Sequence, residues 1–241
     1  MLHRLTLLAL VLALFAPAAA ASTPSELGEA LRAKQPVFLV VTQSGARGTD
    51  KALEIAKQAQ ALVPTARVVT MDRGDQGNAA LVKKYRVLGA PVPLILVLAP
   101  NGIVAGGALL KDASPKVIAN LVPTPKKTDM LGALQAKRAV FVVFGHSKLS
   151  IHGKVLEICR KAFTRMEATT QKAQVIAVDA NDKAEAKFRA EMKVDPLATE
   201  PMVVVLNAQG QKTAVFREGM TVEQLVAAAT QKAACCPGGS C

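Results

Sequence analysis

Two segments of this chain recur later in the sequence in the same order. Lys51–Lys57 and Lys154–Arg160 share four of seven residues, and the second lies 103 positions after the first. Further along, Pro93–Gly102 matches Pro201–Gly210 at a spacing of 108 positions. Because the order is kept and the spacing drifts by only five positions, the 241-residue chain is a duplication of one domain. Solenoid repeats have much shorter units, about 20–50 residues, so they are excluded.

Each copy alternates apolar runs with amphipathic segments. Val37–Val41 and its counterpart Val140–Phe144 are continuous apolar runs, typical of central strands that are covered on both faces. Apolar residues between positions 49 and 62 recur at a helical period of about 3.6. The first copy is predicted to contain helices from Thr23 and over 49–62, 77–85 and 114–121, and strands over 37–41, 68–71, 94–98 and 103–108.

Local patterns set the predicted boundaries. Thr23 is expected to cap the first helix, with Glu26 as its capping-box partner. Thr221 starts the last helix, which is expected to end near residue 232. Pro123–Lys127 is predicted to be a linker, because proline is excluded from helix interiors and central strands. The predicted domains therefore span 24–122 and 128–232, with a flexible tail over 233–241.

The element order and one further segment carry a family resemblance. Asn78–Val87, followed by Pro91 and Pro93, resembles the segment of thioredoxin that leads to its cis-proline, and Ala184–Val194 precedes Glu200–Pro201 in the same way. The resemblance implies an α/β fold of two consecutive thioredoxin-like domains, each a mixed central sheet flanked by helices. It also implies cis bonds at Val92–Pro93 and Glu200–Pro201, with Pro91 as the alternative in the first copy, and peptide binding beside these residues.

The family's redox motif is missing from both copies. Thioredoxin chemistry needs Cys-x-x-Cys where the first strand passes into the next helix, because the helix N-terminus lowers a thiol pKa. Here Thr42–Gly48 and Gly145–Ile151 hold that position, and neither contains cysteine. This departure argues against dithiol catalysis. His146 and His152 are interpreted as polar loop and first-turn residues, with a metal contact completed by cysteines from elsewhere as the alternative.

The N-terminus predicts export. A basic start at Met1–Arg4, an apolar run at Leu5–Phe15 and small residues up to Ala21 are typical of a signal peptide cleaved after Ala21. The mature protein is therefore expected in the periplasm or outside the cell, with no membrane span. Its formal net charge is +12, but aromatic residues make up only 3%, too few for the stacking that single-stranded nucleic acids require. We expect no nucleic-acid partner.

Three of the four cysteines lie in the last seven residues, at Cys235, Cys236 and Cys241. They can form a structural or intermolecular disulfide, exchange thiols with a partner, or bind a thiophilic ion such as Cu(I). A closed zinc site would need a fourth ligand. Cys159 lies on a predicted helix where the first copy has Ala56, and it is interpreted as a small buried side chain.

These patterns predict a binding or scaffolding module without the classical dithiol site, acting on a protein or peptide partner. The predicted binding surface includes Val92, Pro93, Glu200 and Pro201. The alternative is thiol-dependent redox or soft-metal chemistry through Cys235, Cys236 and Cys241. No cofactor is certain from the sequence, and no residue is assigned a catalytic role.

Overall fold

A computed structural model of the chain describes residues 22–195, 198–217 and 219–231. The predicted signal peptide, residues 1–21, and the predicted tail cysteines Cys235, Cys236 and Cys241 lie outside the described residues.

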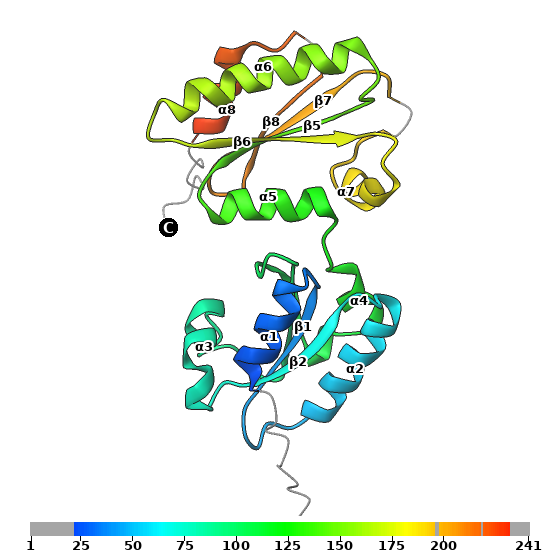
Figure 1. Ribbon diagram of the computed structural model, residues 1–241, viewed down its shortest axis with the longest axis vertical. Coiled ribbons are helices and arrows are strands. Elements are labelled where there is room, and N and C mark those ends of the chain that lie inside the picture. Colours follow the sequence, from blue (N-terminus) through cyan, green and yellow to red (C-terminus); the bar gives the residue numbers. More distant parts are fainter. Residues whose placement is uncertain (1–21, 196–197, 218, 232–241) are drawn as a thin grey trace, which may run out of the picture.

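The described elements form two successive sets (Figure 1). We call the first set, α1 to α4, domain 1 and the second set, α5 to α8, domain 2. Domain 1 contains α1 Thr23–Arg32, β1 Val37–Thr42, α2 Thr49–Leu62, β2 Arg67–Asp72, α3 Ala79–Tyr85, β3 Leu94–Leu98, β4 Val104–Leu109 and α4 Pro115–Asn120. Domain 2 contains α5 Pro125–Gln135, β5 Ala139–Gly145, α6 Ser150–Glu167, β6 Ala173–Asp179, α7 Ala186–Glu191, β7 Met202–Leu206, β8 Lys212–Phe216 and α8 Val222–Thr230. The 3₁₀ turns are η1 Gln76–Asn78, η2 Leu110–Asp112 and η3 Lys183–Glu185.

Each domain has one four-stranded mixed sheet. The strand order is β2-β1-β3-β4 in domain 1 and β6-β5-β7-β8 in domain 2. The first two strands of each domain are parallel, and the last two run antiparallel to their neighbours. The central strands β1 and β5 are buried along their whole length, as their continuous apolar runs predict.

Helices cover both faces of each sheet. In β1, Leu39 packs with α1 and α3, whereas Phe38 packs with α2 and α4, because successive side chains point to opposite faces. In domain 2, α5 and α7 cover one face and α6 and α8 the other. Phe38 and Phe141 occupy equivalent positions and are fully buried. Both domains are therefore three-layer α/β/α structures with two core clusters each.

Two boundary predictions are wrong. The predicted linker is largely helical, because Pro125 is the first residue of α5, where its missing N–H costs no hydrogen bond. Thr124 caps this helix with its side chain. Thr23 does not cap α1; its hydroxyl donates to the carbonyl of Thr70 instead, and Ser22 takes the cap position. Thr221 and Gln224 do form a capping box at α8.

The domain junction is held by polar contacts on both sides. The Lys187 ammonium, in α7, donates to the carbonyls of Asn120 and, at 2.8 Å, of Val122, which are orphan acceptors at the end of α4. The Glu185 carboxylate accepts the N–H of Lys126 in the first turn of α5 at 2.8 Å. Asn101, in the β3–β4 hairpin, donates to the carbonyl of Thr128 at 3.3 Å. The junction is thus part of the folded structure.

Among the helices that residues 22–231 form outside the gaps, none combines the length and the apolar character needed to cross a bilayer.

Candidate functional site

The two loops that replace the redox motif lie at the carboxyl ends of the central strands. In domain 1 the β1–α2 loop follows Thr42, and in domain 2 the β5–α6 loop follows Gly145. Strand β3 runs antiparallel to β1, so the hairpin that contacts α5 is at the opposite end of the sheet from the β1–α2 loop. The β1–α2 loop consequently faces away from domain 2 (Figure 1).

Hydrogen bonds close the β1–α2 loop on itself. The hydroxyls of Thr42 and Thr49 lie 2.6 Å apart, and Thr49 also donates to the carbonyl of Ala46 at 3.1 Å. The Arg73 guanidinium donates to Gln43 at 2.8–2.9 Å and to the carbonyls of Val87 and Ala90. Arg73 therefore ties this loop to the segment before Pro93.

A different set of polar contacts holds the β5–α6 loop. The Ser147 hydroxyl donates to the carboxylate of Asp179, and Asn181 lies 3.3 Å from Nδ1 of His146. The bond from Ser147, followed by the N–H of Asn181, lowers the pKa of Asp179. Because Ser147 is bonded to a carboxylate and not to a histidine, the geometry gives no Ser–His nucleophile pair.

His152 lies in the first turn of α6, at the position that corresponds to Thr49. Its side chain is only 4% exposed, and its Nδ1 has no hydrogen-bond partner among the residues that the structure describes. Burial lowers the pKa of His152, an effect that Asp179 partly offsets and His146 reinforces. His152 is therefore a first-turn residue, as interpreted from the sequence, and its imidazole is buried and neutral.

The lowered pKa makes stability depend on pH. Below the ordinary histidine pKa of 6.5, the unfolded chain binds a proton that folded His152 does not. We expect the contribution of His152 to the free energy of unfolding to be complete above pH 6.5. It should decrease as the pH falls from there toward the pKa of folded His152. Urea unfolding at several pH values between 5 and 7.5 measures this. A His152→Gln variant that kept the same slope would contradict the assignment.

The two predicted prolines have different outcomes. The Val92–Pro93 bond is cis, as predicted, and Pro93 is near Gly48: a Cβ added to Gly48 would lie 3.9 Å from its ring. The Glu200–Pro201 bond is not among the cis bonds of the described residues, so this prediction is wrong. Trans is the more stable X-Pro isomer by about 0.5–1 kcal/mol. Both prolines are buried, whereas Val92 is half-buried and Glu200 is exposed.

In each domain, therefore, a loop at the end of the central strand opens a long helix beside the proline that precedes the third strand. Both domains are thioredoxin-like. Each also has the element order, mixed sheet and helix layers that the thioredoxin-like resemblance implied.

The solved structures that resemble this chain have low sequence identity to it. The first two thioredoxin domains of Saccharomyces cerevisiae Eps1p are 9% identical, with a TM-score of 0.33, over 87% of this chain and 96% of that one. The NTD_N/C domain of alkylhydroperoxide reductase AhpF from Enterococcus faecalis is 13% identical, with a TM-score of 0.29, over 85% and 98%. Zinc-bound human ERp44 is 11% identical, with a TM-score of 0.36, over 85% of this chain and 56% of that one. No protein-family model and no curated protein sequence matches this chain.

The thioredoxin-like domain 2 carries an apolar groove that sequence analysis missed. A pocket of about 290 Å³ lies between α6 and the segment after β8. Its apolar lining comes from Ile151, Val155, Ile158 and Met220. Leu149 and Ile151 are 39% and 42% exposed at the N-terminal end of α6. Large apolar residues in an otherwise polar loop were the available sequence signal.

The equivalent place in domain 1 is arranged differently. There, η2 follows β4, and its Leu110 lies over the β1–α2 loop: a Cβ added to Gly48 would come within 2.5 Å of the Leu110 side chain. Leu110 therefore covers the start of α2, whereas the start of α6 exposes Ile151.

Cys159 is fully buried in the core between α6 and α8, as predicted. Burial raises the pKa of its thiol to about 12, so it is not a reactive nucleophile. Within the described part of the chain, no group of three or more His, Cys, Asp or Glu side chains is arranged to hold a metal ion.

Proposed function

We propose that the protein is an exported, non-catalytic tandem thioredoxin-like module that binds a protein segment through domain 2. The observation that carries the proposal is the exposure of Leu149 and Ile151 beside the apolar groove, at the position where the family has its dithiol. Such exposed apolar side chains next to a pocket are typical of interaction sites. The absence of cysteine from both loops supports binding without dithiol turnover.

Domain 1 serves as the scaffold in this proposal. Its β1–α2 loop is closed by Thr42, Thr49 and Arg73, and Leu110 covers the start of α2. These contacts support a structural role for the predicted surface at Val92 and Pro93. Binding is therefore assigned to the groove of domain 2, with Glu200 and Pro201 at the neighbouring β7 end.

The test uses peptides selected for binding to the mature protein from a displayed random library. Ile151→Asp places a charge in the groove and is expected to weaken these peptides at least about tenfold. Leu88→Asp is the matched control, because Leu88 is 75% exposed in domain 1 and lies outside the groove. Fluorescence anisotropy measures both dissociation constants, with circular dichroism as the folding check. Equal losses in the two variants, or no loss in Ile151→Asp, would contradict the proposal.

A second proposal is thiol chemistry at Cys235, Cys236 and Cys241. It is supported by the burial of Cys159, whose raised pKa leaves reactive thiol chemistry to the tail. Soft-metal capture, with Cu(I) as the example, and disulfide exchange are the two forms of this proposal. An insulin-reduction assay on full-length and tail-deleted protein separates it from the first, because only the second proposal expects turnover that depends on the tail.

A further inference from the structure

The groove has room for one or two side chains. Its volume of about 290 Å³ lies just below the range of about 300–1,000 Å³ typical of small-molecule sites. It is also open along α6, because Ile151, Lys154 and Ile158 belong to successive turns of the helix. These dimensions suit an apolar side chain projecting from a protein segment that continues along the helix.

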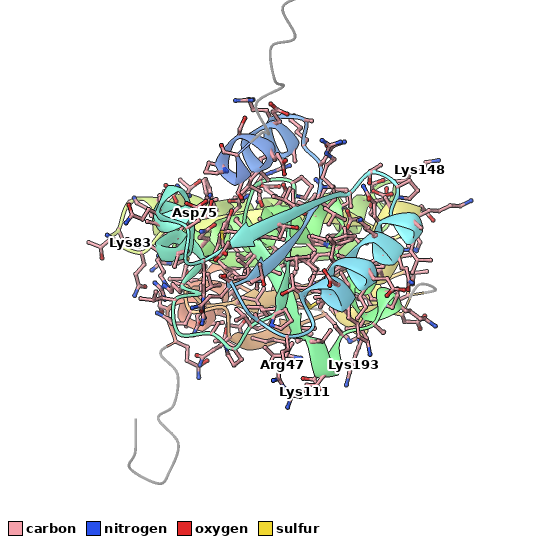
Figure 2. The ribbon with its side chains drawn as sticks, turned by 90° about the horizontal axis from the view of Figure 1, so that it is seen from below. Arg47, Asp75, Lys83, Lys111, Lys148 and Lys193 are labelled. Atoms are coloured by element: carbon pink, nitrogen blue, oxygen red, sulfur yellow. The ribbon has the colours of Figure 1, made fainter. Side chains whose placement is uncertain are left out.

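Among the residues that the structure describes at the groove, the charged ones are basic. Lys154 and Arg217 line it together with the apolar residues, and none of its described lining residues is acidic. Neither side chain forms a salt bridge with any residue that the structure describes. Glu157, one turn along α6, is already paired with Lys161 at 2.8 Å. Lys148, in the loop before α6, points into solvent (Figure 2).

Domain 1 also has basic residues near the start of its second helix, but their surroundings differ from those of Lys154 and Arg217. Arg47 and Lys111 point outward on the same side of domain 1 (Figure 2), next to Gly48 and Leu110. Lys51 occupies the position on α2 that Lys154 occupies on α6. In domain 1 the Leu110 side chain lies over the start of α2, at the place where domain 2 exposes Ile151. Domain 1 thus supplies charged positions for matched controls.

We propose that the groove of domain 2 binds an acidic protein segment that inserts one large apolar side chain. The apolar side chain fills the space between Ile151, Val155 and Met220. Carboxylates on either side of it pair with Lys154 and Arg217, which have no described partner of their own. Opposite charges around an apolar contact select the partner and raise the association rate. This inference rests on the proposed function and specifies the partner's chemistry.

The experiment compares three fluorescent peptides on the mature protein by anisotropy. All three have a central Phe-Leu pair, which Glu, Gln or Lys residues flank. We expect the Glu peptide to bind at least about tenfold more tightly than the Gln peptide, and the Lys peptide to bind most weakly. The double variant Lys154→Glu/Arg217→Glu should reverse this order. Lys51→Glu, the matched control in domain 1, should leave the order unchanged. Added salt should weaken the Glu peptide most.

The outcomes separate this inference from the proposed function. If the three peptides bind equally and lose binding in Ile151→Asp, the groove binds protein segments without charge selection, and only the acidic-partner inference is overturned. If Lys51→Glu changes the order as strongly as the double variant, the preference comes from overall charge, and the inference is again overturned. If none of the three peptides binds while library-selected peptides still depend on Ile151, the proposed function stands and the acidic-partner inference fails.

Discussion

Phe38→Ala is expected to lower the free energy of unfolding of domain 1 by about 3–5 kcal/mol, and Phe141→Ala to do the same to domain 2. Both rings are fully buried between the sheet and the helices packed on that face. These helices are α2 and α4 in domain 1 and α6 and α8 in domain 2. Each truncation removes apolar contacts and leaves a cavity that the packed neighbours fill only in part. These are the largest single-residue effects that we expect in this chain.

A single tyrosine allows the unfolding of domain 1 to be followed separately from that of domain 2. Tyr85 is the sole tyrosine of the chain, which has no tryptophan, so tyrosine fluorescence reports on domain 1. In urea, Phe38→Ala should move the tyrosine-detected transition to lower denaturant, whereas Phe141→Ala should leave it nearly unchanged. Far-UV circular dichroism should detect both losses. A tyrosine transition that moves equally in both variants would show that the two domains unfold as one cooperative unit.

Gly145→Ala is expected to lower the free energy of unfolding by about 1–3 kcal/mol. The added Cβ would lie 2.5 Å from His152 Nδ1 and 3.4 Å from the Pro201 Cα, closer to the imidazole than packed atoms allow. His152 is buried beneath the first turn of α6 and has little room to move. The glycine at the end of β5 is thus required by the imidazole beside it.

A double-mutant cycle tests this contact. In a His152→Ala background the clash is removed, so Gly145→Ala should cost much less than in the parent protein. Gly153→Ala is the matched control, because Gly153 is in the same helix and a Cβ there meets nothing within 4 Å. That change should stabilise the helix by up to about 1 kcal/mol. Equal costs of Gly145→Ala in both backgrounds would rule out steric conflict with His152.

The fold was predictable because its main signals are local in the sequence and occur twice. Continuous apolar runs predicted the central strands β1 and β5. The repeated order of elements predicted two domains with the same fold. Pro125 was misassigned because proline is excluded from helix interiors but favoured at the first helical position, and the choice depends on where the helix starts. The isomer of the bond before Pro201 likewise depends on tertiary surroundings that a sequence motif does not contain.

The site was harder to predict because its parts come from distant segments. The groove needs Ile151 and Arg217 side by side, and only the fold brings α6 and the end of β8 together. The role of Arg73 in holding the domain 1 loop depends on carbonyls of the segment before Pro93, which carry no side-chain signature. The burial of His152 follows from its place under the first helical turn, not from its neighbours in sequence.

The junction contacts bear on how the two domains can move relative to each other. Lys187 and Glu185 belong to one short stretch of domain 2: Lys187 donates to the carbonyls of Asn120 and Val122, and Glu185 accepts the N–H of Lys126 at the start of α5. Asn101 adds a contact from the hairpin of domain 1. The contacts of Lys187 and Asn101 link domain 1 to domain 2 directly and restrict the motion of one domain relative to the other. A protein segment bound in the groove of domain 2, as we propose, would therefore have its orientation relative to domain 1 limited by these two contacts.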